Sequence, residues 1–205
     1  MITSYHRFII KINSFRTITS FVILLGLPLL FTFTGCSKSE KPAETEEPQQ
    51  TAVRGFRAVQ WGMTADEVKK NEKLKLTGGD SSRIVFSGEV YGHKAEVYYF
   101  FDESGTLYSG TIRFEVNDKK PDEAITIYKS VKSELEKELG KASADEVVLN
   151  DSSKTEDVKS APEGLVTGNK IFTADWNDNP GTQIGIILSK SGDSPLTLGI
   201  VYQRK

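Results

Sequence analysis

Residues 107–140, "LYSGTIRFEVNDKKPDEAITIYKSVKSELEKELG", decide the fold, because an extended pattern and a helical pattern follow each other in this one stretch. In the first part, apolar or small residues alternate with polar ones. This period of two predicts a half-buried antiparallel strand. The predicted inward positions are Tyr108, Gly110, Ile112, Phe114 and Val116.

From Pro121 onward, the apolar residues recur every three or four positions, which predicts a long helix with one apolar stripe. Gly140 stands where a residue with positive φ commonly ends a helix. The predicted stripe consists of Ala124, Tyr128, Val131, Leu135 and Leu139.

A second helix and five further strands flank this stretch. Thr64 followed by Glu67 forms a capping-box pattern, which predicts a short helix over residues 65–72. The strands are predicted from apolar runs bounded by turn-forming residues. They are Arg83–Gly92, Lys94–Asp102, Lys170–Trp176, Thr182–Ser189 and Leu196–Gln203.

The resulting order is helix, three strands, helix, three strands, and it predicts one α+β domain over residues 56–205. We expect an antiparallel sheet with both helices on one face, and the order admits an αβββ pseudo-repeat. Residues 150–168 are polar and are predicted to form a long loop within this domain. A domain of about 150 residues buries enough surface to need no disulfide.

Residues 1–35 have the order of a secretory signal. Basic residues without acidic ones precede the apolar run Phe21–Phe33, and the small residues Thr34 and Gly35 follow it. The alternative is an uncleaved transmembrane helix, since the stretch from Thr17 to Gly35 is just long enough to cross roughly 30 Å of hydrocarbon. Pro28 disfavours that helix.

The only cysteine of the chain, Cys36, ends the sequence "FTGC". This sequence resembles the lipobox of bacterial lipoproteins. The resemblance implies cleavage after Gly35, diacylglycerol on the Cys36 sulfur and, in many bacteria, N-acylation of the new terminus. Two or three acyl chains give stable membrane attachment, whereas one chain attaches only reversibly. Because position 37 is not Asp, resemblance to enterobacterial sorting implies the outer membrane, facing the periplasm, in a Gram-negative cell.

Residues 36–55 are predicted to be the lipidated N-terminus and a disordered tether, since they are rich in Glu, Lys, Pro and Gln and poor in apolar residues. Removal of residues 1–35 leaves 23 basic against 28 acidic residues, a formal charge of −5. This acidic balance disfavours nucleic-acid binding, which depends on neutralising phosphates. We therefore expect membrane attachment through Cys36, an envelope protein partner and no nucleic acid.

No catalytic or metal-binding constellation is evident in the sequence. His93 is the only histidine after the signal, so a histidine cluster is excluded. Residues 175–181, "DWNDNPG", resemble a calcium loop only in part, because Pro180 stands where glycine is required. Asp102 and Glu103 are neighbours in a predicted turn. We expect no catalytic residue, no metal and no cofactor, although a hydrolase using acidic residues stays open as an alternative.

Both faces of the strand around residues 95–101 carry aromatic residues. Because side chains alternate along a strand, Tyr98 and Phe100 share one face, whereas Tyr99 and Phe101 share the other. Either this strand is covered on both sides, or Tyr98 and Phe100 form an exposed contact surface. These two residues are therefore our candidate contact surface.

The sequence "WGMTADEV", residues 61–68, resembles the helix start of small envelope lipoproteins of the SmpA/OmlA type and of related modules with the β-lactamase-inhibitor-protein fold. The resemblance implies an αβ module that works through protein contacts, and it transfers no catalytic residue. The expected function is a non-enzymatic, lipid-anchored envelope protein that binds a protein partner or a ligand. The alternatives are an envelope hydrolase and an enzyme-inhibitor-like module.

Overall fold

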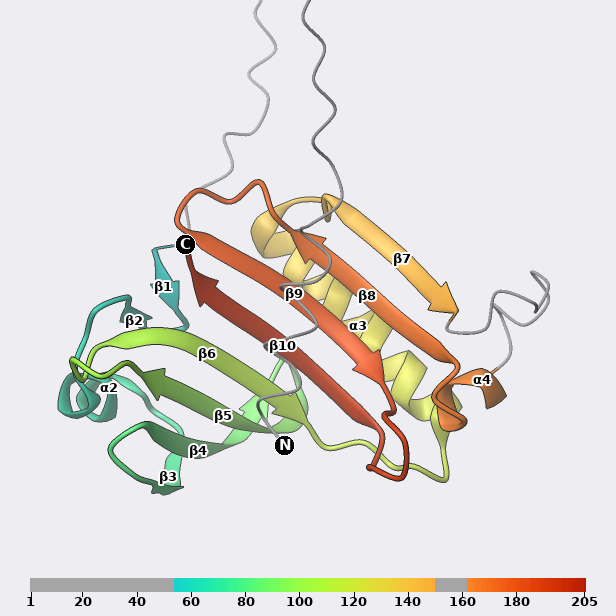
Figure 1. The fold of residues 1–205 in the computed structure, drawn as a ribbon, viewed down its shortest axis with the longest axis horizontal. Helices are drawn as coiled ribbons and strands as arrows, with labels where there is room; N and C mark the ends of the chain where they lie inside the picture. The colour runs from blue at the N-terminus through green and yellow to red at the C-terminus, as the bar shows by residue number, and fades with distance from the viewer. Residues whose placement is uncertain (1–53, 150–161) are drawn as a thin grey trace, which may run out of the picture. The chain divides into compact units, whose positions relative to one another are not determined.

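The computed structural model describes residues 54–149 and 162–205 (Figure 1). The predicted signal, Cys36, nearly all of the predicted tether and most of the predicted loop lie outside the described residues. Within the two described ranges, no helix combines the length and the hydropathy of a membrane span.

One eight-stranded antiparallel sheet forms the centre of the fold. Its strands are β3 (Lys75–Gly79), β4 (Arg83–Val90), β5 (His93–Phe101), β6 (Leu107–Phe114), β7 (Ala144–Leu149), β8 (Lys170–Trp176), β9 (Thr182–Ser189) and β10 (Thr197–Arg204). They lie in the order β3-β4-β5-β6-β10-β9-β8-β7, so two four-stranded meanders meet where β6 pairs with β10 (Figure 1). The predicted α+β class is confirmed.

Each half of the sheet begins with a helix, α2 (Ala65–Asn71) in the first half and α3 (Pro121–Leu139) in the second. The repeating unit is therefore αββββ and not the predicted αβββ, because β3 and β7 add an outer strand to each half. All five residues of β3 are exposed, so this strand carries no alternation of buried and exposed positions. A short helix, α4 (Glu163–Val166), occupies part of the predicted loop.

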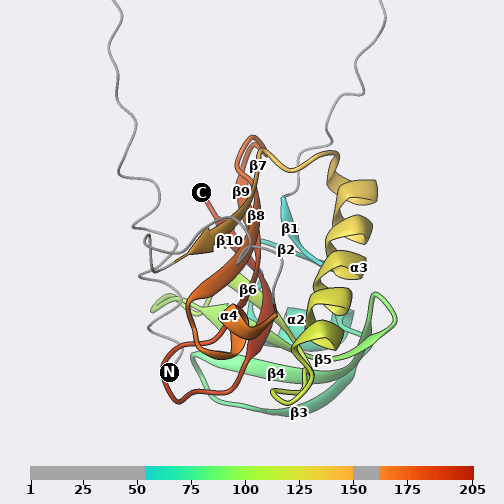
Figure 2. The ribbon, with the colours of Figure 1, turned by 90° about the vertical axis from the view of Figure 1, so that its right-hand side faces the viewer.

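Both α2 and α3 lie on one face of the sheet, which curls around them (Figure 2). The apolar stripe of α3 is buried at all five predicted positions. Gly140 ends this helix with a φ of 80°, and its N–H donates to the Glu136 carbonyl oxygen at 3.0 Å. A small hairpin, β1 (Gly55–Phe56) and β2 (Val59–Gln60), precedes α2 and lies on the same side of the sheet (Figure 2).

Strand β6 departs from the predicted alternation at one end. A β-bulge sets Phe100 opposite Ser109 but Phe101 opposite Leu107, so one residue of β6 is extra. Leu107 is fully buried and Tyr108 is only half-buried. The prediction that Tyr108 is an inward position is therefore wrong, because the bulge shifts the alternation by one residue.

Candidate functional site

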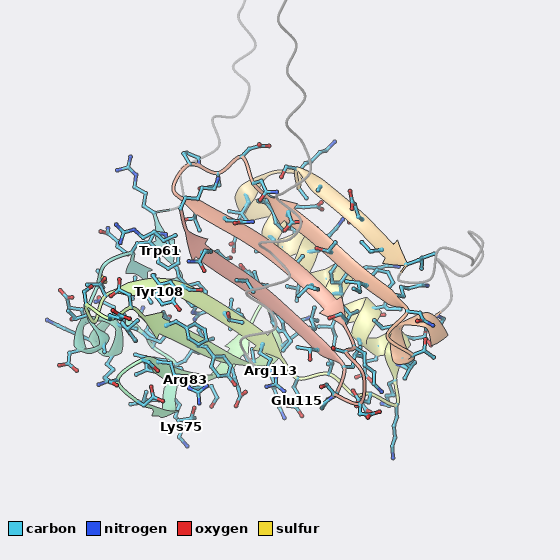
Figure 3. The ribbon with its side chains drawn as sticks, in the orientation of Figure 1. Trp61, Lys75, Arg83, Tyr108, Arg113 and Glu115 are labelled. Carbon is cyan, nitrogen blue, oxygen red and sulfur yellow. The ribbon has the colours of Figure 1, made fainter. Side chains whose placement is uncertain are left out.

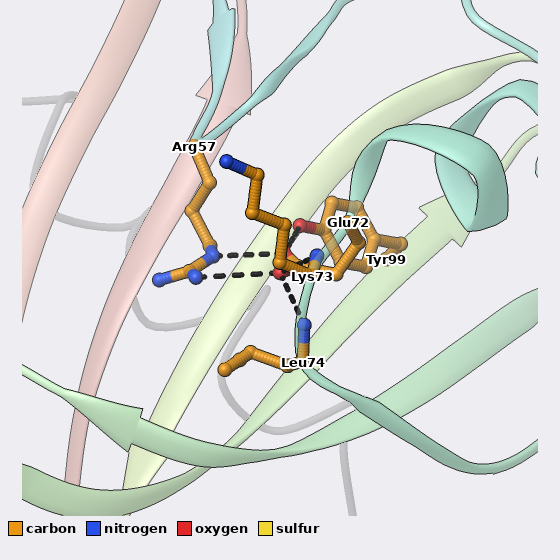
Figure 4. Close-up of polar contacts among 5 residues, drawn as sticks. All are labelled: Arg57, Glu72, Lys73, Leu74 and Tyr99. Carbon is orange, nitrogen blue, oxygen red and sulfur yellow. Dashed lines mark hydrogen bonds and ion pairs between the residues drawn. The ribbon is translucent and has the colours of Figure 1, made fainter.

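Glu72, at the end of α2, carries a carboxylate that is only 2% exposed. Arg57 of the hairpin donates from Nε to Oε2 at 2.9 Å and from Nη2 to Oε1 at 3.4 Å (Figure 4). The backbone N–H groups of Lys73 and Leu74 donate to Oε1 at 2.7 and 3.0 Å. The Tyr99 hydroxyl donates to Oε2. One carboxylate thus joins the hairpin, the helix end and the strand β5.

These hydrogen bonds fix the charge of Glu72. Burial favours the neutral acid, but donors from Arg57, Tyr99 and Leu74 outweigh burial and lower the pKa of Glu72 to about 2. Burial, followed by the Glu72 carboxylate, raises the pKa of Tyr99. A carboxylate has about four lone-pair sites, and Glu72 already accepts five hydrogen bonds. Glu72 is therefore suited to holding elements together and not to accepting a substrate proton.

The same hairpin inserts an aromatic ring into the core. Phe56 is fully buried, and its ring centroid lies 5.0 Å from those of Tyr99 and Tyr202. A Cβ at Gly110 would lie 2.0 Å from Phe56 Cδ1, so only glycine leaves room for this ring. The Glu72 cluster and the Phe56 contacts together fasten the start of the folded chain to the sheet.

The sheet face opposite α2 and α3 is the second candidate, and we call it the open face. In the first half of the sheet its exposed or half-buried residues are Lys75, Arg83, Val85, Ser87, Glu89, Lys94, Glu96, Tyr98, Phe100, Thr111 and Arg113. Ser109 faces the same side but is fully buried. No described helix lies over these residues, and Arg83 and Arg113 are seen on this face in Figure 3.

Tyr98 and Phe100 lie on β5, in the first half of the open face. Both side chains are half-buried, whereas Val97, Tyr99 and Phe101 between and beside them are buried on the helix side. The two rings are nearly parallel, at an interplanar angle of 9° with centroids 6.3 Å apart. The structure thus gives Tyr98 and Phe100 the shared face that the sequence predicts for them, and it leaves both rings in part accessible.

The charged groups beside the two rings come in pairs of opposite sign. Arg83 lies directly opposite Phe100, and its Nε is 3.9 Å from Asp80 Oδ2. The Tyr98 hydroxyl donates to Glu96 Oε2 at 2.6 Å, and Glu96 lies opposite Arg113 on β6. Burial and then Glu96 raise the pKa of Tyr98. Two basic and two acidic side chains therefore lie near the aromatic pair, and their formal charges sum to zero.

The other half of the sheet offers an internal comparison for these rings. Strand β9 is the third strand of its meander, as β5 is of the first. Its outward residues are Gln183, Gly185, Ile187 and Ser189, which include no aromatic side chain. A strand in this position therefore forms without outward aromatic rings, so the architecture does not require Tyr98 and Phe100 to be aromatic.

His93 and Asp102, the other residues considered as catalytic candidates, contact neighbouring side chains of the fold. His93 Nε2 lies 3.5 Å from Ser130 Oγ, at the outer limit of a hydrogen bond. Asp102 accepts hydrogen bonds from Ser104 and Thr106 within its own turn, and these lower the pKa of Asp102 to about 2. Within residues 54–149 and 162–205, no three His, Cys, Asp or Glu side chains are grouped to hold a metal ion.

The Glu72 cluster was missed by sequence reasoning. Arg57 and Tyr99 lie 15 and 27 residues from Glu72 along the chain, and no local motif connects them. The one available signal was an acidic residue, Glu72, at the end of a predicted helix and two positions before the apolar Leu74.

No family model, no curated protein and no solved structure matches this chain significantly.

Proposed function

We propose that the protein is a non-enzymatic, lipid-anchored protein of the cell envelope that binds a protein partner or a ligand through its open face. The observation that carries the binding role is the pair Tyr98 and Phe100, two half-exposed parallel rings on a face that no described helix covers. The comparison with β9 supports it, because the fold does not require aromatic residues there.

The anchor is Cys36, with the lipobox-like "FTGC" and the preceding signal-like segment as its support. The protein would be held at the outer membrane and face the periplasm in a Gram-negative cell. The anchor is tested by Cys36→Ser, with Ser37→Ala as the matched control. We expect Cys36→Ser to lose palmitate labelling and membrane sedimentation, and Ser37→Ala to keep both. Unchanged labelling and sedimentation of Cys36→Ser would refute the anchor.

The binding role is tested with a photo-crosslinking amino acid at position 98 or 100 in intact cells. Position 187 of β9 is the control, since Ile187 is also half-buried and points outward from the same sheet. We expect reproducible adducts from positions 98 and 100 and few from 187. Absence of adducts at 98 and 100, or equal adducts at all three positions, would contradict the proposed site.

The hydrolase alternative has less support. The Glu72 carboxylate is buried and saturated with donors, and Asp102 is occupied by its own turn. A hydrolase needs an acid and a base in environments that separate their pKa values around the working pH. In both carboxylates the pKa is instead lowered to about 2, which suits neither role.

A further inference from the structure

The two outer strands of the sheet differ in how well they are protected against pairing with another chain. An outer strand leaves every second pair of backbone N–H and C=O groups unpaired, and proteins commonly guard it with lysine, proline, glycine or a β-bulge. β3 carries Lys75, Gly78 and Gly79, and its pairing with β4 is interrupted by a bulge between Leu76 and Gly78. β3 is therefore a poor template for a further strand.

β7 has none of these protections. Its residues pair with β8 in one unbroken register, from Ala144 opposite Asp175 to Leu149 opposite Lys170, and its sequence "ADEVVL" contains no proline, glycine or lysine. It pairs with β8 alone among the described residues, so its other edge forms one side of the sheet (Figure 1). This edge is regular enough to accept one more antiparallel strand.

The side chains of β7 define what such a strand would contain. Residues 147–149, at the end of β7, are apolar and half-buried, whereas Asp145 and Glu146 before them are exposed. Asp145 forms an ion pair with Lys132 of α3. Glu146 has no ion-pair partner among the described residues. An added antiparallel strand therefore meets an apolar segment first and an unpaired carboxylate after it.

A second carboxylate makes the surroundings of Glu146 more negative. Glu146 lies opposite Thr173 of β8, on the same side of the sheet as Asp175. Burial, followed by the Glu146 carboxylate, raises the pKa of Asp175. Asp175 also lacks an ion-pair partner within residues 54–149 and 162–205. A cationic side chain opposite Glu146 would offset this negative charge, and an anionic one would add to it.

A second copy of this chain fits the edge less well than a basic peptide does. In the two registers that pair most of the strand with its own copy, Glu146 faces either itself or Val148, and neither gives that carboxylate a cation. β3 of a second copy offers Lys75, but the bulge directly after Leu76 ends its regular edge. Charge complementarity therefore favours a separate chain.

We propose that the outer edge of β7 binds an extended peptide as a ninth antiparallel strand of the sheet, and that this peptide has apolar residues followed by a basic residue. Antiparallel pairing sets its apolar residues opposite residues 147–149 and its basic residue opposite Glu146. Main-chain hydrogen bonds supply the affinity, and the side chains supply the specificity. This edge is a different surface from the open face, so the inference goes beyond the proposed function.

The test uses the full-length protein in detergent and two fluorescent peptides, Val-Val-Ile-Lys-Thr-Thr and the same peptide with glutamate in place of lysine. Binding is followed by fluorescence anisotropy. We expect saturable binding of the lysine peptide, about threefold or more tighter than that of the glutamate peptide. Glu146→Lys should reverse this preference, and Lys75→Glu on β3 should leave it unchanged. Both substitutions are at exposed positions, and unchanged thermal unfolding excludes misfolding.

A second readout distinguishes strand addition from simple charge attraction. Alternate N–H groups of an added strand point toward β7, so methylation of the backbone nitrogen of either the isoleucine or the lysine, but not of both alike, should abolish binding. A photo-crosslinking residue in place of the isoleucine should attach within residues 145–149.

Three results would overturn the proposal. The first is no saturable binding of either peptide, which would leave the edge to another segment of this chain or to a second copy. The second is a preference between the peptides that Glu146→Lys does not change. The third is equal binding of the two methylated peptides. The open face is tested separately, by crosslinking from positions 98 and 100, so failure at β7 leaves that proposal intact.

Discussion

Replacing Glu72 with glutamine should lower the free energy of unfolding by about 3 kcal/mol at neutral pH. Folding lowers the pKa of this carboxyl from 4.5 to about 2. One pKa unit corresponds to about 1.4 kcal/mol, so the charged form is favoured in the folded state by about 3 kcal/mol. Loss of one partner from a buried ion pair costs about 3–5 kcal/mol. The lower end applies here, because the Arg57 side chain is 25% exposed and can be solvated in the variant.

The assay is equilibrium denaturation with urea, followed by circular dichroism and tryptophan fluorescence. Asp66→Asn is the matched control on the same helix. Asp66 is 92% exposed and contacts only Lys69 among the ion pairs of the described residues, at 3.1 Å. We expect this control to change the unfolding free energy by less than about 0.5 kcal/mol.

The same reasoning predicts a pH dependence with a definite sign. The pKa of Glu72 is lower in the folded than in the unfolded state, so the stabilisation is complete above pH 4.5 and is lost as the pH falls toward 2. The stability difference between wild type and Glu72→Gln should therefore shrink across this window. Subtracting the variant's profile removes the contribution of Asp102, whose pKa is also lowered to about 2.

Two results would refute the argument. One is an unfolding free energy of Glu72→Gln within about 0.5 kcal/mol of wild type at pH 7. The other is a stability difference that stays constant between pH 5 and pH 2. Either result would mean that the Glu72 carboxylate is not an ionised link between Arg57 and Tyr99.

Two further substitutions test the packing around the helices and the hairpin. The Tyr128 hydroxyl is buried with no hydrogen-bond partner among the described residues, so Tyr128→Phe should leave stability unchanged or raise it by up to about 1 kcal/mol in urea denaturation. A loss above about 1 kcal/mol would reveal a partner for that hydroxyl. Gly110→Ala places a Cβ 2.0 Å from the Phe56 ring and should destabilise the protein by about 1–3 kcal/mol, seen as a lower melting temperature. The double variant with Phe56→Ala should lose less than the sum of the two single losses, and strict additivity would contradict the predicted clash.

Local periodicity made much of the fold predictable. The stripe of α3 and the alternation of Gly110, Ile112 and Phe114 in β6 predict the buried face of each element, because burial of one face imposes a period of 3.6 or 2 on the residues. Turn residues mark most of the boundaries. The outer strand β3 has no buried face, and therefore it carries no periodic signal from which it could be predicted.

The open face was predictable only in part. Because side chains alternate along a strand, Tyr98 and Phe100 lie on one face and Tyr99 and Phe101 on the other in any sheet that contains this strand. Which of the two aromatic faces the helices cover depends on the packing of α2, α3 and the hairpin against the sheet. That packing buries Tyr99 and leaves Tyr98 half-exposed.

By itself, the sequence determined the helix α3, six of the eight strands, the antiparallel α+β class and the position of the single cysteine. Only the tertiary structure decided the strand order, the two outer strands and the bulge that buries Leu107 in place of Tyr108. It also brought Arg57 and Tyr99 within hydrogen-bond distance of Glu72. The physical reason is that periodicity reports burial within one element, whereas the partners of a side chain are set by cross-strand register and by contacts between distant segments.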